Sequence, residues 1–171
     1  VRDPIYLPGK RGNSIKETDD GGFIIGGTDN SSSILIKTDN EGNFLWKKNY
    51  DFSDIVDIEI DYDGGYIFTG SSGGNNILVK TDSFGNIIWS KTYSFSNNTR
   101  ANSLTKTNDS GYVIVGDFDP NGDVLKSGGE AAFVVKTDSQ GNEIWSNTYS
   151  KLNSENINTL GAYFVEQTND G

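Results

Sequence analysis

Short apolar runs alternate with polar turns along the whole chain, and no segment carries the 3.6-residue spacing of an amphipathic helix. One kind of run is aromatic and β-branched, follows an Asp-Gly or Ser-Gly pair, and predicts strands at residues 23–27, 66–70 and 112–116. A second kind ends in lysine and predicts strands at residues 34–37, 77–80 and 133–136. Such residues favour a pleated, mostly buried strand over a helix. The chain is therefore predicted to be all-β.

The turns and the residues on either side of the apolar runs recur in each repeat. An apolar residue anchors a strand upstream of each Asp-Gly or Ser-Gly turn, and these anchors are Ile15, Ile58, Leu104 and Val165. Glycine takes positive φ without a Cβ clash, so the turns predict hairpins. Downstream, the pattern Lys-Thr-Asp-x-x-Gly-Asn-x-x-Trp occupies residues 37–46, 80–89 and 136–145 and leads into a strand that closes with Tyr50, Tyr93 or Tyr149. Each repeat thus predicts four short strands.

The spacing of these motifs divides the chain. Residues 1–12 match no repeat and predict an extended lead-in, the repeats cover 13–54, 55–100 and 101–158, and residues 159–171 match the first strand of a fourth. The first two motif tryptophans are 43 positions apart (89 − 46) and the next two are 56 apart (145 − 89). The extra residues lie mainly in a polar loop at 117–130, and an insertion between strands supports the strand prediction. We expect one propeller-like domain.

Units of about 43 residues with four antiparallel strands have the size of a propeller blade, which buries its faces against its neighbours. The motif resembles the tryptophan-docking repeat of quinoprotein-type β-propellers and, more closely, the tandem DGGY…KTDxxGNxxW repeats of large secreted or cell-surface proteins of bacteria and archaea. The resemblance implies that the turn Asp and Gly and the strand Trp hold adjacent blades together. The residues concerned are Asp39, Gly42, Trp46, Asp82, Gly85, Trp89, Asp138, Gly141 and Trp145. The resemblance to these repeats also implies an extracellular or cell-surface location. The acidic, basic and metal-binding residues at the centre of quinone-binding enzymes have no match here.

Composition narrows the functional classes. The 171 residues include no Cys, Met or His, which excludes a thiol nucleophile, an imidazole base and the usual zinc sites. A net charge of −10 opposes binding to nucleic acid or to an anionic membrane surface. The apolar runs are too short to span a bilayer. We expect no enzyme and no cofactor.

Carboxylates gather in two places. Asp57, Glu59, Asp61 and Asp63 share one side of a strand and would suit an acid/base pair or calcium. The other repeats are not acidic there, so a solvated strand face is the simpler interpretation. The inserted loop offers a better calcium candidate in Asp119, Asn121 and Asp123. The recurring lysines are expected at solvated, outward positions; they are Lys37, Lys80 and Lys136.

Two further kinds of residue suggest contact with sugars. Asn30, Asn97 and Asn108 begin Asn-x-Ser/Thr sequons, which permit glycosylation of an exported chain. The tryptophans have the identical placement that blade packing requires, whereas tyrosines at strand ends could form a lectin-like surface. These tyrosines are Tyr50, Tyr93 and Tyr149.

Three blades and one strand fall short of the four to eight blades of closed propellers, and an open fan would expose strand edges. The partners expected are therefore further blades of a longer parent chain or other copies of this chain, with glycans or surface proteins as additional candidates. The leading hypothesis is a non-enzymatic structural or binding scaffold, in which copies can assemble by strand completion. The alternatives are a fragment of a quinoprotein-like or glycan-active propeller enzyme, and a lectin-like propeller.

Overall fold

The computed structural model describes residues 10–29, 32–96, 98–120, 131–150 and 160–168. These residues contain twelve strands in three four-stranded antiparallel sheets, which confirms the predicted all-β fold with four-stranded blades. Blade 1 consists of β1 (Lys10–Glu17), β2 (Phe23–Asp29), β3 (Ser32–Thr38) and β4 (Phe44–Tyr50). Blade 2 consists of β5 (Asp54–Ile60), β6 (Tyr66–Ser72), β7 (Asn75–Thr81) and β8 (Ile87–Tyr93). Blade 3 consists of β9 (Thr99–Lys106), β10 (Tyr112–Phe118), β11 (Ala131–Thr137) and β12 (Glu143–Ser150).

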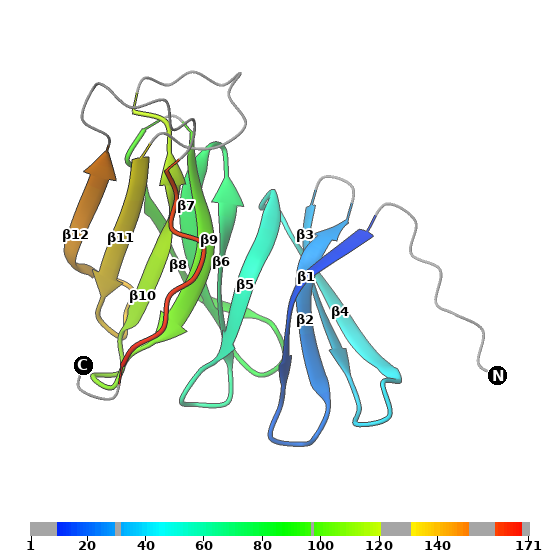
Figure 1. The fold of residues 1–171 in the computed structure, drawn as a ribbon. Coiled ribbons are helices and arrows are strands. Elements are labelled where there is room, and N and C mark those ends of the chain that lie inside the picture. The colour runs from blue at the N-terminus through cyan, green and yellow to red at the C-terminus, as the bar shows by residue number, and fades with distance from the viewer. Residues whose placement is uncertain (1–9, 30–31, 97, 121–130, 151–159, 169–171) are drawn as a thin grey trace.

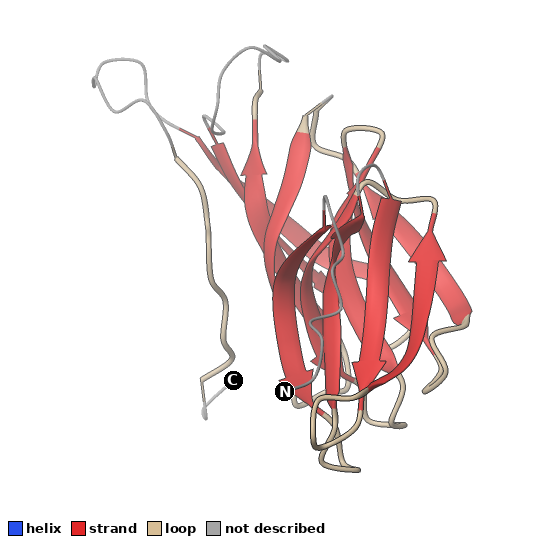
Figure 2. Ribbon diagram, turned by 90° about the vertical axis from the view of Figure 1, so that its right-hand side faces the viewer, coloured by secondary structure: helices blue, strands red, loops and turns tan. Residues whose placement is uncertain are grey.

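The three blades stand side by side like the leaves of a fan (Figure 1). In each blade the strands follow chain order, so the first and the fourth strands are the two edges. The first strands β1, β5 and β9 contact one another in sequence and form the inner side. Figure 2 shows the same strands from the side, with hairpin turns at both ends of the blades. No helix among the described residues is long and apolar enough to cross a membrane.

Apolar side chains are buried between the blades, because each blade is a single layer and has no other surface to cover its faces. The first interface buries residues of blades 1 and 2, namely Ile24, Leu35, Tyr50, Ile55, Ile58, Tyr66, Phe68, Ile77 and Val79. The second buries residues of blades 2 and 3, among them Ile67, Leu78, Tyr93, Leu104, Tyr112, Ile114, Phe133 and Val135. The two interfaces thus bury residues from equivalent positions of the repeat.

Several predicted boundaries are wrong by a few residues. β1 begins at Lys10, so the last three residues of the predicted 1–12 lead-in pair with β2. β9 begins at Thr99, inside the segment predicted to belong to the second repeat. Asp117 and Phe118 are not part of the inserted loop, because they continue β10 and pair with the start of β11. Aromatic packing favours this extension, since the Phe118 ring lies 5.7 Å from that of Phe95.

Residues 160–168 run beside β9 but form no strand, unlike the predicted first strand of a fourth blade. The Asn102 side-chain amide donates to the carbonyl oxygen of Ala162 at 3.0 Å, and the backbone N–H of Val165 donates to Ser103 Oγ at 3.4 Å. Asn13 donates in the same way to the carbonyl oxygen of Ile55 at 2.7 Å. Residues 160–168 therefore contact β9 in the way that β5 contacts β1. Among the described residues no further strand pairs with this segment, so it does not form a regular ladder of backbone hydrogen bonds.

Candidate functional site

The motif turns have one geometry in all three blades. Asp39 accepts from the backbone N–H groups of Glu41 and Asn43 and from the Asn43 side chain, at 2.9, 2.7 and 2.6 Å. Asp82 and Asp138 make the same three contacts in their blades. These hydrogen bonds, led by the one from the Asn86 side chain, lower the pKa of Asp82. The recurring motif acids therefore shape the turns.

The motif glycine receives the tryptophan of the preceding blade. Gly85 and Gly141 have φ of +76° and +72°, which favours glycine. A Cβ added to Gly85 would lie 3.2 Å from Trp46 Cη2, and one added to Gly141 would lie 2.7 Å from Trp89 Cζ3. The tryptophan of one blade thus packs directly on the turn backbone of the next.

Tyrosine completes the contact at the end of the same strand. Tyr50 donates to the carbonyl oxygen of Gly85 and Tyr93 to that of Gly141, both at 2.7 Å. Burial raises the pKa of both hydroxyls. The lectin-like surface predicted from the strand-end tyrosines is wrong for these two, because interface packing leaves them only 7% and 6% exposed.

The equivalent face of blade 3 is open. Tyr149 is 56% exposed and Trp145 is 45% exposed, in contrast to the buried Tyr50 and Tyr93. No turn glycine of another blade lies on them in the described part of the chain. At the other end of the fan, Gly42 has the same turn geometry, with φ of +78°, and a Cβ there would meet no atom within 4 Å. Blade 3 therefore exposes the tryptophan and tyrosine of the interblade contact, and blade 1 exposes the glycine turn that would receive such a pair.

The outer face of blade 1 is apolar as well. Ile15 is paired with Ile25, and Ile25 with Ile36, in a row across three strands. Ile15 is 57% exposed, whereas Ile58, at the equivalent position in blade 2, is fully buried against blade 1. Blade 1 thus presents the kind of surface that blades 2 and 3 bury at their interfaces.

Asp57 on β5 bridges the three blades by hydrogen bonds. Asp57 Oδ1 accepts from Ser14 Oγ and from the backbone N–H of Ile58, both at 2.9 Å. Its Oδ2 accepts from Ser103 Oγ at 3.2 Å and from the backbone N–H of Leu104 at 3.0 Å. Four hydrogen bonds use the usual acceptor capacity of a carboxylate, so Asp57 is a structural group.

Glu59 on β5 and Asp61, which directly follows β5, are also paired rather than solvated, which corrects the prediction. Glu59 forms an ion pair with Lys16 at 2.7 Å, beside a hollow of about 430 Å³ between the inner strands. Asp61 is buried and pairs with Lys80 at 2.6 Å, and it accepts from the Tyr112 hydroxyl at 3.0 Å. Burial lowers the pKa of Lys80, but its hydrogen bonds to Asp61 and Asp63 outweigh this and raise the pKa overall. These acids cross-link strands and blades.

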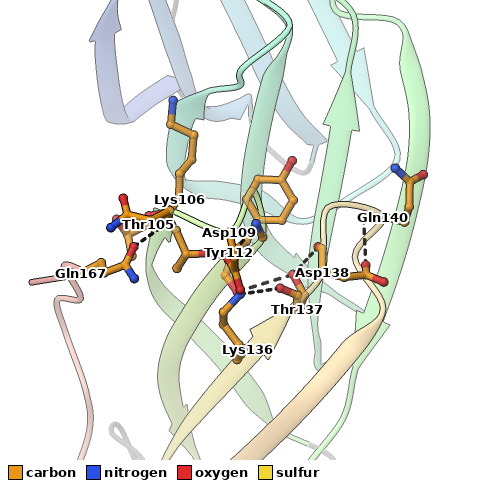
Figure 3. A network of polar contacts seen from close by, with 12 residues as sticks. Thr105, Lys106, Asp109, Tyr112, Lys136, Thr137, Asp138, Gln140 and Gln167 are labelled. Carbon is orange, nitrogen blue, oxygen red and sulfur yellow. Dashed lines mark hydrogen bonds and ion pairs between the residues drawn. The ribbon is translucent and has the colours of Figure 1, made fainter. Parts of the chain in front are cut away.

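The recurring lysines are not solvated as predicted. Lys37 is buried and donates to both carboxylate oxygens of Asp20 and to the carbonyl oxygen of Thr38, at 2.8–3.0 Å. Figure 3 shows Lys136 reaching Asp109 and Thr137 in the same way, at 2.9 Å for each bond. The lysine thus ties the hairpin turn to the third strand. The signal was available, since this lysine and the turn acid recur together in every repeat.

The metal and glycosylation candidates fall largely outside the described residues. Asn121 and Asp123 of the calcium candidate lie there, whereas Asp119 is buried at the end of β10. Among the described residues no group of three or more acidic side chains is placed to hold a metal ion. Asn30 and Asn97 are also outside the described residues, and Asn108 is exposed in the turn after β9.

Comparisons with known proteins bear on the fold. A scan against family models and a search of curated proteins both find no match. A solved structure of the Dos1 propeller is similar, with a TM-score of 0.52 and 16% identity over 83% of this chain. The match covers 37% of that chain, so this chain spans well under half the length of its structural neighbour. The molecule has a β-propeller-like fold, and the finer assignment to quinoprotein-type repeats stays a prediction.

Proposed function

We propose that this chain is part of a non-enzymatic β-propeller scaffold whose blade 3 binds a further blade of the same repeat. The observation that carries the proposal is the exposure of Trp145 and Tyr149, two side chains whose equivalents pack on the glycine turn of the next blade. Large exposed apolar surfaces on otherwise soluble proteins commonly mark interaction sites. Residues 160–168 already occupy the inner position beside β9, so the missing partner consists of the remaining strands and their motif turn.

The scaffold would act by holding loops in a fixed arrangement around a rigid set of blades. An extracellular or cell-surface location is proposed from the resemblance of the repeats to those of large surface proteins. The source of the next blade is either a longer parent chain or another copy of this chain, and copies would then assemble by completing the sheet next to blade 3.

A chain extended by one blade tests the proposal. Residues 22–50 are appended after Gly171, since Asp170-Gly171 repeats the sequence Asp20-Gly21. Fluorotryptophan labelling and ¹⁹F NMR then report the solvent exposure of each indole. We expect Trp145 to become as protected as Trp46 and Trp89.

A matched control carries valine at the appended copy of the Gly42 position, where it would block the indole. Protection of Trp145 should then be lost. Equal exposure of Trp145 in the original and the extended chains would contradict the docking proposal. Light scattering on the original chain separates the two sources. Association that is abolished by Trp145→Ala would identify a second copy as the source of the next blade. A strict monomer would instead favour a longer parent chain.

A further inference from the structure

A hollow of about 340 Å³ lies at the interface between blades 1 and 2, near the hairpin turns. The rings of Trp46, Tyr66 and Phe84 line it, together with the carboxylates of Asp19 and Asp20. Phe84 is largely exposed, although it is one of the larger apolar side chains of the blade. Sites for small ligands have this size and combine apolar walls with a few polar groups.

The repeat supplies an internal comparison for this hollow. Asp19 and Ile60, which both line it, correspond to Tyr62 and Lys106 at the interface between blades 2 and 3. There the Lys106 ammonium lies 4.5 Å from the centre of the Tyr62 ring. The Tyr62 hydroxyl donates to the carbonyl oxygen of Thr107 at 2.8 Å. At these two positions the second interface therefore has an aromatic ring and an organic cation, whereas the first interface has the Asp19 carboxylate and the aliphatic side chain of Ile60.

The charges around the hollow favour a cation. The charged residues that line it are Asp19, Asp20 and Lys37. The Lys37 ammonium directs its three donors to Asp20 and to the Thr38 carbonyl, so these two side chains neutralise each other. Asp19 is exposed, and within the described residues its carboxylate has no hydrogen bond or ion pair. One negative charge therefore remains beside the aromatic rings.

We infer that this hollow binds an organic ammonium group carried on a small apolar body. The cation lies between the Asp19 carboxylate and the faces of Trp46 and Phe84, where ring quadrupoles attract positive charge. The apolar body covers ring surface that is otherwise exposed to water. The ligand thus takes the place that Lys106 and Tyr62 fill at the second interface. The inference is independent of blade docking, because it uses neither Trp145 nor Tyr149.

The first experiment uses choline as the probe and follows the tryptophan indole N–H signals by NMR. Its neutral isostere, 3,3-dimethylbutan-1-ol, has the same shape without the charge. We expect choline to shift the Trp46 signal saturably, to leave Trp145 unchanged, and to bind about fivefold or more tightly than the alcohol. Equal binding of the two probes, or no saturable shift of Trp46, would overturn the inference.

Variants then test the residues. Asp19→Asn removes the charge without breaking a bond and should weaken choline binding about threefold to tenfold. Asp51→Asn removes a charge from an exposed position outside the hollow and should leave binding unchanged; an equal loss in both would mean only general attraction to an acidic protein. The double variant Asp19→Tyr/Ile60→Lys reproduces the second interface and should abolish binding. If the double variant does not fold, Asp19→Asn and Asp51→Asn still decide the outcome.

Discussion

Tyr50 in blade 1 donates a 2.7 Å hydrogen bond to the carbonyl oxygen of Gly85 in blade 2. Together with Trp46, this contact joins the outer strand of one blade to a turn of the next. Tyr93 and Gly141 repeat it between blades 2 and 3. Tyr149 occupies the same repeat position but is exposed, so comparing the three tyrosines measures how much the interblade contact contributes to stability.

Removing the hydroxyl should therefore have different effects in the three blades. Tyr50→Phe and Tyr93→Phe leave a buried carbonyl oxygen without its donor and should each lower the free energy of unfolding by about 1 kcal/mol. Tyr149→Phe should change it by less than about 0.5 kcal/mol, because the side chain is exposed. Urea denaturation of the three variants measures the difference. Equal losses in all three would show that the interblade hydrogen bond does not contribute to stability.

The turn glycines allow a second matched comparison. Gly42 and Gly141 both have positive φ, so alanine at either position should cost about 1 kcal/mol of backbone strain. Only at Gly141 does the new Cβ also meet Trp89 and Lys91, at 2.7 and 2.9 Å. We expect Gly141→Ala to be destabilising by about 1–3 kcal/mol more than Gly42→Ala.

The comparison requires a protein concentration at which light scattering shows a monomer, so that Gly42 stays free of a second copy. Thermal or urea unfolding then gives both values. If the two alanine variants are equally destabilised, the indole has room to move away and the tryptophan does not hold the blades in register.

Repetition made the fold predictable from sequence. The run that starts at Phe23 and the run that starts at Tyr66 share one pattern, and an all-β fold of blade-sized units followed from it without knowledge of any contact. Strand ends were less predictable. The extra residues of the third repeat predict a polar loop at 117–130, whereas cross-strand pairing extends β10 through Asp117 and Phe118. Pairing of this kind depends on the partner strand and is invisible in a local pattern.

The polar contacts between blades were predicted least well. A carboxylate on a strand with alternating polar residues, such as Asp57, reads as solvated, because the sequence does not reveal that the neighbouring strands contribute Ser14 and Ser103. The sequence predicts a solvated Lys37 for the same reason, although this side chain is buried against Asp20. Aligning the repeats gives a signal for such groups. The position of Asp57 holds a hydrogen-bonding residue in each of the three complete repeats.

Acid should weaken the fold through the hairpin-turn carboxylates. The Thr107 hydroxyl and the Lys136 ammonium lower the pKa of Asp109 from 3.8 to about 2. A folded-state pKa below the unfolded value stabilises the protein at pH values above the unfolded pKa, and this contribution is lost as the pH falls through the folded pKa. The free energy of unfolding should therefore decrease between about pH 4 and pH 2.

The variant Asp109→Asn cannot titrate and should show a shallower decrease over this pH range. Urea midpoints measured at several pH values test this. The salt concentration is kept constant, because the Asp109 carboxylate is exposed and salt screens its interaction with Lys136. Asp51→Asn, at an exposed position, serves as the control for the loss of one negative charge. A pH profile of Asp109→Asn that parallels that of the unmodified chain would assign the acid sensitivity to other groups.

Asp57 offers the most direct test of how the inner strands are held together. Asp57→Ala removes the acceptor for Ser14, Ser103 and two backbone N–H groups, and we expect a loss of about 3 kcal/mol in the free energy of unfolding. Asp57→Ser installs the residue that the other two complete repeats carry. Ser14 already accepts from the backbone N–H of Ile58 at 3.3 Å, so a serine hydroxyl at position 57 can accept from that of Leu104. The serine variant should therefore recover more than half of the loss. Equal destabilisation by alanine and serine would mean that the carboxylate, with two oxygens to bridge both neighbouring blades, is required at this central position.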